Sequence, residues 1–151
     1  MIEGGFNIMD WLNLKDKVYI VTGGSSGIGK AIVKELLNDG AKVVNADLKK
    51  MDYVHDNLHF IKTDVTSLAQ IENTVKETLD TFKDIDGVIN NAGINLPKLL
   101  VDLDDPKGEY ELNEETFNKI FSINVKSVLL MSQAVARVLA KKKSGVIINM
   151  S

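Results

Sequence analysis

Three glycines near the start of the chain follow a short run of apolar residues and could form a phosphate-binding turn. Gly23, Gly27 and Gly29 come directly after Val18–Thr22 and lead into a stretch with helical periodicity. Glycine allows positive φ and lets a phosphate approach without a Cβ in the way, and the first turn of a helix offers unpaired N–H groups and a positive dipole end. The run predicts a turn that binds a dinucleotide pyrophosphate through Gly23, Ser25, Ser26, Gly27, Ile28 and Gly29. Taken alone, the glycines also suit a flexible turn, because their spacing differs from G-x-G-x-x-G.

A carboxylate further along the chain could bind another part of the same dinucleotide. Asp47 ends a second apolar run, 42–47, 18 positions after Gly29. The acid that binds the adenosine ribose is expected about 20 residues after such a turn. A carboxylate accepts hydrogen bonds from a ribose 2′-hydroxyl and repels a 2′-phosphate, so Asp47 predicts NAD rather than NADP as the cofactor. Lys49 and Lys50 could soften that repulsion, although solvated lysines are the simpler interpretation.

Small and polar residues follow two further predicted strands. Asn91, Ala92 and Gly93 come after the strand 87–90, at the sheet edge that faces the ligand crevice in an open α/β sheet. They would let a cofactor lie close to the chain, although a plain turn would also use them. Asp64 and Val65 follow the strand 58–62, where the Asp64 carboxylate either meets an adenine amino group or caps the turn before Ser67.

Asn124 interrupts the apolar seam of a long predicted helix. Its predicted neighbours on this seam are Phe117, Ile120, Phe121, Val128, Met131, Val135 and Val138. An unpaired buried amide costs roughly 1–3 kcal/mol, so a backbone kink, a water or a catalytic group must satisfy it. Asn124 therefore either fixes the helix register or holds the water of a proton relay.

The elements that position these residues alternate between strand and helix patterns. We expect strands over 18–22, 42–47, 58–62, 87–90 and 145–150, and helices over 27–38, 68–82 and from Asn113 to about Lys143. Ser67 and Gln70 fit a capping box, and residues 95–112 read as an extended loop. Such alternation predicts an α/β fold with a doubly wound parallel sheet.

Composition narrows the class of protein. The 151 residues are 44% hydrophobic and 26% charged, which is typical of one globular domain. The net charge of −3 argues against a nucleic-acid partner, and the absence of cysteine excludes disulfides. The longest uncharged run has 12 residues, below the roughly 20 that span a bilayer. The first 14 residues lack a secretion signal, so we expect a cytoplasmic protein, and neither His55 nor His59 has partners for a metal site.

Together these motifs resemble the short-chain dehydrogenase/reductase family. The resemblance covers about Leu14 to Ser151 and includes 22–29, Asp47, Asp64-Val65, 90–93, Asn124 and 145–151, in order and spacing. It implies a Rossmann-type NAD-binding domain over 14–151, after an N-terminal extension of residues 1–13. It also implies hydride transfer between a secondary alcohol carbon and the nicotinamide, with Asn124 as a catalytic residue that anchors a water.

Three segments are similar to the bacterial branch of the family that acts on sorbitol 6-phosphate: 96–102, 108–114 and 131–137. This similarity implies a sugar alcohol phosphate as the small-molecule substrate. A sugar acid and a 3-oxoacyl thioester stay open as alternatives within the family.

The chain departs from the family pattern at the catalytic pair. The family has a tyrosine followed four residues later by a lysine, whereas Tyr19, Tyr53 and Tyr110 are followed by Gly23, Asn57 and Glu114. Family spacing places the catalytic serine just after Ser151. We therefore expect the N-terminal part of a longer enzyme, with a sheet that stops after its fifth strand, no dehydrogenase activity alone and a homo-oligomer when full length. A nucleotide-binding module without catalysis is the alternative.

Overall fold

The computed structural model describes residues 12–151 and contains one parallel sheet. Its strands are β1 (Val18–Thr22), β2 (Lys42–Asp47), β3 (Leu58–Lys62), β4 (Gly87–Asn90) and β5 (Val146–Asn149). They lie in the order β3-β2-β1-β4-β5, and every neighbouring pair is parallel. The chain therefore builds outward from β1 in both directions, which confirms the predicted Rossmann-type sheet. The predicted extension 1–13 lies outside the described residues except for its last two.

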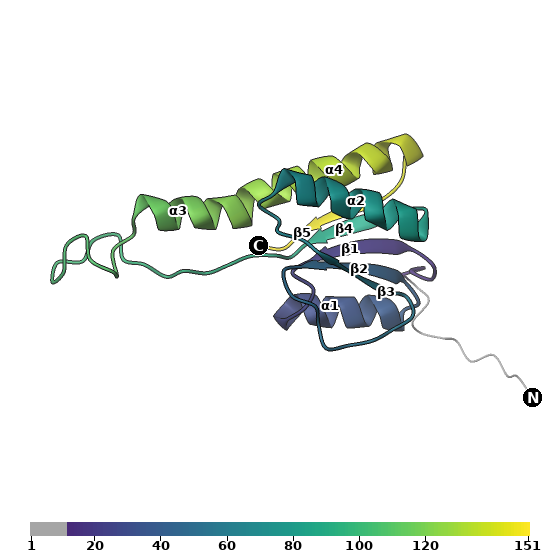
Figure 1. Ribbon diagram of the computed structural model, residues 1–151, viewed down its shortest axis with the longest axis horizontal. Coiled ribbons are helices and arrows are strands. Elements are labelled where there is room, and N and C mark those ends of the chain that lie inside the picture. Colours follow the sequence, from purple (N-terminus) through teal and green to yellow (C-terminus); the bar gives the residue numbers. More distant parts are fainter. Residues whose placement is uncertain (1–11) are drawn as a thin grey trace, which may run out of the picture.

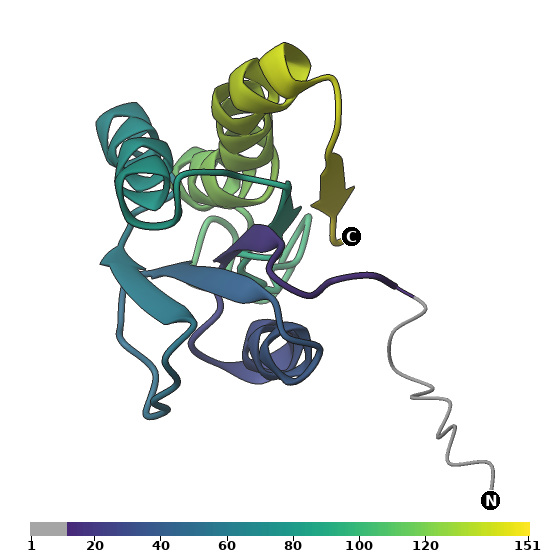
Figure 2. The same ribbon diagram turned by 90° about the vertical axis from the view of Figure 1, so that its right-hand side faces the viewer.

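Helices cover both faces of this sheet (Figures 1 and 2). Helix α1 (Gly27–Asn38) packs on one face, and α2 (Leu68–Phe82) and α4 (Ser127–Lys142) pack on the other. Alternate side chains of β1 supply the two cores: Tyr19 and Val21 face α1, whereas Ile20 faces α2 and α4. The central strands β1, β2 and β4 are buried on both faces, as their apolar runs predict, whereas β3 is mostly half-buried and β5 is exposed along its length.

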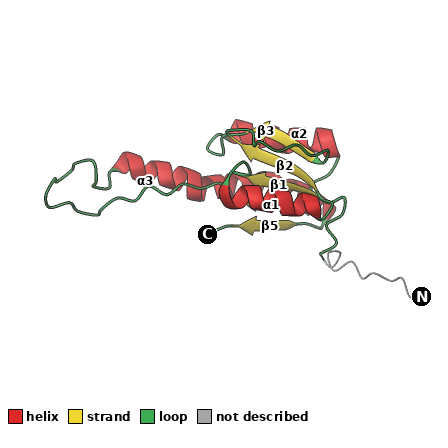
Figure 3. Ribbon diagram, turned by 90° about the horizontal axis from the view of Figure 1, so that it is seen from below, coloured by secondary structure: helices red, strands yellow, loops and turns green. Residues whose placement is uncertain are grey.

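The long predicted helix is present but is neither uniform nor buried along its whole length. It consists of α3 (Glu114–Phe121), a π-helical segment (Ser122–Lys126) and α4, and the Ser127 N–H donates to the Ser122 carbonyl five residues back. Only α4 lies over the sheet, where Met131 and Val135 are buried. The α3 half projects past the carboxyl edge of the sheet and has no buried residue (Figures 1 and 3). The predicted apolar seam therefore enters the core only after the π segment.

By length and composition, the stretch Glu114–Lys142 could also cross a membrane. This is weak support for a span, because a core helix of a globular domain passes the same test. The α4 half packs against β4 and α2 in the domain core, as a core helix does.

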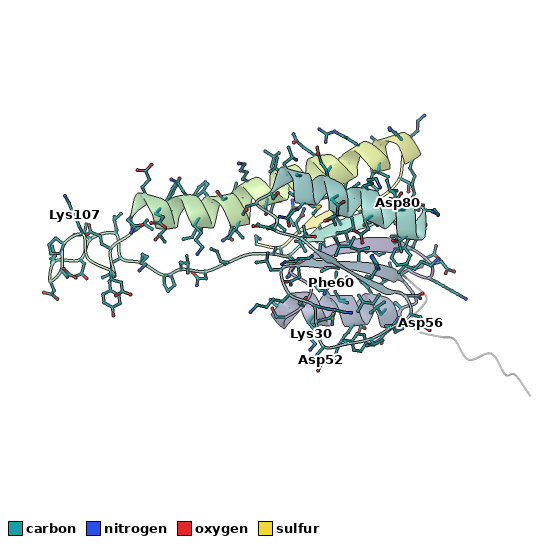
Figure 4. The ribbon with its side chains drawn as sticks, in the orientation of Figure 1. Lys30, Asp52, Asp56, Phe60, Asp80 and Lys107 are labelled. Atoms are coloured by element: carbon teal, nitrogen blue, oxygen red, sulfur yellow. The ribbon has the colours of Figure 1, made fainter. Side chains whose placement is uncertain are left out.

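Three local predictions need correction or completion. The last strand is Val146–Asn149, shorter than 145–150. The capping box is only half formed: the Ser67 hydroxyl accepts from the Gln70 N–H, but Gln70 Oε1 accepts from the Asp64 N–H because the Ser67 N–H already bonds the Asp64 carbonyl. The loop 95–112 is extended, as predicted, with one bridge between Leu99 and Glu111 and with Lys107 near its far end (Figure 4).

A charged cluster joins the sheet to α4 at the amino ends of the strands. Asp86 precedes β4 and is 8% exposed. Its carboxylate accepts from Lys142 Nζ at 2.6 Å, from the Val18 N–H at 2.9 Å and from Lys17 Nζ at 3.3 Å. Burial raises the pKa of Asp86, but these hydrogen bonds outweigh burial, so the pKa of this carboxyl lies below its usual range.

We expect Asp86→Asn to lower the free energy of unfolding at pH 7 by about 1.5–3 kcal/mol, because charge-assisted bonds at a buried site are lost. Since the folded pKa is depressed, this stabilisation is complete above the unfolded pKa near 4 and is lost as the pH falls through the folded pKa. Urea unfolding of both proteins at pH 7 and pH 3 measures the difference, which should shrink in acid.

The matched control is Asp80→Asn on α2 (Figure 4), which breaks the exposed pair between Lys76 and Asp80. Exposed pairs of this kind contribute little to stability. Equal effects of the two substitutions at pH 7 would contradict a special role for the Asp86 cluster.

Candidate functional site

A cavity of about 420 Å³ lies at the carboxyl ends of β1, β2 and β4. The chain leaves β1 toward β2 on one side and reaches β4 on the other, so the cavity occupies the switch point at which open α/β sheets bind ligands. Eleven of the twelve predicted cofactor residues line it: Gly23, Ser26, Gly27, Ile28, Gly29, Asp47, Asp64, Val65, Asn91, Ala92 and Gly93. Residues from four separate turns of the chain therefore meet at one place.

Ser25 is the exception and does not line the cavity. Its N–H donates to Asp47 Oδ2 at 2.9 Å, and its hydroxyl donates to the Lys49 carbonyl. The hydroxyl therefore joins the glycine turn to the segment after β2, and a direct contact of Ser25 with the cofactor stays a prediction.

The three glycines of the turn differ in how strictly the structure requires them. Gly23 has φ +66° and Gly27 has φ +51°, both in the left-handed region. A Cβ on Gly29 would lie 2.2 Å from the Gly23 carbonyl oxygen, whereas a Cβ on Gly27 would meet no atom within 4 Å. Gly29 is thus required for packing inside the turn, and Gly27 leaves open space beside the cavity.

The first turn of α1 keeps its N–H donors free of side-chain caps. Its N-cap residue, Ser26, is extended and makes no side-chain cap bond. By contrast, Ser67 caps α2 by accepting from Gln70, and Asn113 caps α3 by accepting from Thr116. Because unpaired donors at a helix N-terminus attract anions, the end of α1 that faces the cavity is suited to a phosphate.

Thr22 and Asn91 join the ends of β1 and β4 behind the cavity. Thr22 Oγ1 accepts from the N–H groups of Asn91 and Ala92, both at 3.0 Å. Asn91 Nδ2 donates to the carbonyls of Thr22 and Gly23 at 3.1 and 3.2 Å. Asn91 therefore supports the glycine turn from beneath, a positioning role that the sequence did not reveal.

The carboxylate of Asp47 is held at the rim of the cavity by two backbone donors. Oδ2 accepts from the Ser25 N–H at 2.9 Å and Oδ1 from the Lys49 N–H at 3.1 Å. Each carboxylate oxygen can accept a second bond, so acceptor capacity remains for a ligand hydroxyl. The predicted acid is therefore close to the glycine turn and has a fixed orientation.

The Asp64 carboxylate makes the turn contacts that one of its two predictions describes, and its contact with an adenine stays a prediction. Its Oδ1 accepts from the Thr66 N–H at 2.9 Å and from the Thr66 hydroxyl at 2.7 Å, which closes the turn before α2. Asp64 and Val65 still line the cavity, on the side away from β4. Their place at the cavity wall is compatible with a bound base.

The prediction that Asn124 is a buried amide is wrong. Asn124 is exposed, because it lies in the π segment, where the helix has passed the edge of the sheet and left the core. Both ends of its amide are nevertheless paired with one residue: Oδ1 accepts from the Ile94 N–H at 2.9 Å, and Nδ2 donates to the Ile94 carbonyl at 2.8 Å. Asn124 thus fastens the loop after β4 to the helix at the cavity mouth, beside Gly93.

Several cavity residues were not predicted: Ala46, Leu48, Thr63, Ile94 and Ile123. Ala46 and Thr63 come from the strand ends that also supply Asp47 and Asp64, so the strand pattern could have indicated them. Ile123 could not be found this way, because it comes from the π segment. Among residues 12–151, no group of three or more His, Cys, Asp or Glu side chains is placed to hold a metal ion.

The chain matches a known protein family over almost all of the described residues. The family model described as short chain dehydrogenase matches residues 17–151. The chain belongs to the short-chain dehydrogenase family. The match extends from the residue before β1 to Ser151 and includes every segment that lines the cavity.

Two curated relatives illustrate how the chain is placed within the family. It is 52% identical over 143 residues to sorbitol-6-phosphate 2-dehydrogenase of Klebsiella pneumoniae, covering 93% of this chain and 54% of the relative. It is 37% identical over 144 residues to a 3-oxoacyl-[acyl-carrier-protein] reductase of Vibrio cholerae, covering 91% and 55%. The chain spans about half the length of the curated relatives it matches.

Solved structures of family members share the fold. A 3-ketoacyl-(acyl-carrier-protein) reductase from Brucella melitensis, complexed with NADH, matches with a TM-score of 0.78 at 28% identity, covering 90% of this chain and 57% of that one. A short-chain dehydrogenase from Leptospira borgpetersenii with bound NAD+ matches with a TM-score of 0.79 at 27% identity, covering 99% and 55%.

The different roles of two glycines in the turn give a stability test. We expect Gly29→Ala to cost at least about 2 kcal/mol of unfolding free energy, because even one methyl group overlaps the Gly23 carbonyl. Gly27→Asn should cost less than about 1 kcal/mol, because asparagine tolerates positive φ and its side chain enters open space. Urea unfolding of the two variants measures both values, and a larger loss for Gly27→Asn would contradict the described turn.

Proposed function

We propose that the cavity binds NAD, with its pyrophosphate at the first turn of α1 and its adenosine ribose at Asp47. The observation that carries this proposal is the uncapped helix N-terminus beside a carboxylate held at the cavity rim. The relatives solved with NADH and with NAD+ support it. The open space beside Gly27 fits a phosphate, since no protein atom would contact even a Cβ there.

The remaining residues would position the rest of the dinucleotide. The adenine would lie against Asp64 and Val65, whereas Asn91, Ala92 and Gly93 would leave room for the nicotinamide half near Ile94 and Ile123. When bound, NAD supplies the hydride acceptor for alcohol oxidation. Asn124 holds the loop that borders this half, and we assign it the catalytic role of anchoring a water in the proton path of the whole enzyme.

We further propose that the whole protein interconverts a phosphorylated sugar alcohol, sorbitol 6-phosphate, with its ketose phosphate. The 52% identity to the Klebsiella pneumoniae dehydrogenase supports this substrate over a 3-oxoacyl thioester, since identity to the Vibrio cholerae reductase is 37%. The test is turnover of NAD+ by the whole protein with sorbitol 6-phosphate and with a 3-hydroxyacyl thioester. Exclusive use of the thioester would overturn the substrate proposal.

We also propose that the whole protein is a cytoplasmic homo-oligomer whose subunits meet along the helix formed by α3, the π segment and α4. Phe117, Phe121, Val125 and Leu129 recur every four residues there and are 44–57% exposed. Phe117 and Phe121 stack with ring centroids 4.5 Å apart, which adds to one continuous apolar stripe. A stripe of this kind is typical of a surface that is covered by another protein chain.

For the 151-residue protein we expect NADH binding without turnover of any polyol phosphate, because no tyrosine is followed four residues later by lysine. Calorimetric titration with NADH and an absorbance assay at 340 nm measure the two properties. Binding without turnover in the whole protein as well would support a nucleotide-binding module. Failure of the 151-residue protein to bind NADH would contradict the proposed site.

The preference for NADH over NADPH should depend on the negative charge of Asp47. We expect Asp47→Asn to lower the preference for NADH over NADPH by about tenfold or more, because the amide no longer repels a 2′-phosphate. Titration of wild-type and variant protein with both cofactors measures the ratio. Asp39→Asn, at the far end of α1, is the matched control and should leave the ratio unchanged.

A further inference from the structure

Asn45 is a polar side chain where the fold calls for an apolar one. It lies within β2 among Val43, Val44 and Ala46, and its exposed fraction is 0%. Its position in the strand places it on the α1 face together with Val43. An aliphatic residue would satisfy the packing of this strand, so the amide needs another explanation.

The amide is only half paired, which makes it costly for the fold. Nδ2 donates to Ser25 Oγ at 2.9 Å. Oδ1 is the one buried side-chain polar atom among residues 12–151 that has no hydrogen-bond partner. A buried acceptor without a partner destabilises the folded state, and an apolar residue of similar shape removes that cost.

What Asn45 contributes is the orientation of Ser25. Because the Ser25 oxygen accepts from Asn45, its hydrogen is directed to the Lys49 carbonyl. The hydroxyl thus joins the glycine turn to the segment after β2. Ser25 and Lys49 are also the two residues whose backbone N–H groups donate to the Asp47 carboxylate.

The amide also supports the turn from below. A Cβ on Gly24 would lie 2.6 Å from Asn45 Oδ1, so the backbone of the turn rests directly on this side chain. A change at Asn45 therefore reaches both sides of the cavity rim: the glycine turn and the carboxylate.

We propose that Asn45 is a positioning residue for the cofactor, which fixes the Asp47 carboxylate and the glycine turn through Ser25 at a cost in stability. This inference rests on the proposed NAD site and adds the interior residue that sets its geometry. Asn45 does not line the cavity, so it acts only through its neighbours.

The test is Asn45→Val, which removes the amide and suits a buried strand. We expect an unchanged or higher melting temperature together with about tenfold weaker NADH binding, because Ser25 and Asp47 lose their fixed orientation. The preference for NADH over NADPH should also fall, since a mobile carboxylate repels a 2′-phosphate less. A purely structural residue would lower stability and affinity together.

Two further variants keep the outcome interpretable. Ser25→Ala should weaken NADH binding as much as Asn45→Val, and the double variant should be no weaker than either, because both substitutions break one chain of bonds. Asn73→Ala, on the exposed face of α2, is the control and should bind as wild type.

Each outcome decides a different claim. Wild-type affinity in Asn45→Val, or additive losses in the double variant, would overturn the role of Asn45. If Asn45→Val fails to fold, wild-type affinity in Ser25→Ala overturns the proposal. Weaker NADH binding by Ser25→Ala supports it when measured at a temperature at which this variant is fully folded, since the loss of the partner of Asn45 Nδ2 lowers its melting temperature. Absence of NADH binding by the wild-type protein would instead refute the NAD site itself.

Discussion

The first turn of α1 is the feature on which the rest of the site depends. Its N–H groups carry no side-chain cap, although α2 and α3 are both capped by the residue that precedes them. Unpaired donors at a helix end must find an acceptor, and the adjoining cavity is where one can enter. The glycine turn, the Thr22–Asn91 bonds and the Asp47 carboxylate all keep this end of the helix open and in place.

The two ends of the sheet differ in structure: one carries a charged cluster and the other an open cavity. At the amino ends of the strands, the Asp86 carboxylate accepts hydrogen bonds from Lys142, Lys17 and the N–H of the first residue of β1. The bond to Lys142 holds α4 against the sheet. At the carboxyl ends, small residues and backbone donors surround an open cavity. Strong internal pairing thus supplies rigidity at the end where no ligand is expected, and the other end keeps polar groups available for a ligand.

Local patterns in the sequence were sufficient for most of the fold. Glycine positions, apolar periodicity and helix caps reflect interactions between residues close together in the sequence, so strands such as Val18–Thr22 and helices such as Gly27–Asn38 were predictable with their bounds. The glycine turn and Asp47 were predictable because their spacing along the chain reflects their chemistry. The order of the strands in the sheet and the meeting of these segments at one cavity came from the structure.

The rest depended on contacts between distant residues. The periodicity around Asn124 gave no sign that the helix changes to a π turn and leaves the core there, so its exposure and its bonds to Ile94 were not predictable. The bond from the Ser25 hydroxyl to the Lys49 carbonyl was not predictable either, because the two residues lie 24 positions apart. Asn45 carries no motif at all, and only its burial without a full set of partners marks it.

Whether the first turn of α1 binds the cofactor is tested most directly by backbone amide spectra of ¹⁵N-labelled protein during titration with NADH. We expect the largest shifts at Gly27, Ile28 and Gly29, with none at Asp86 on the opposite edge of the sheet. Saturable binding that leaves the amides of this helix turn unmoved would contradict this expectation.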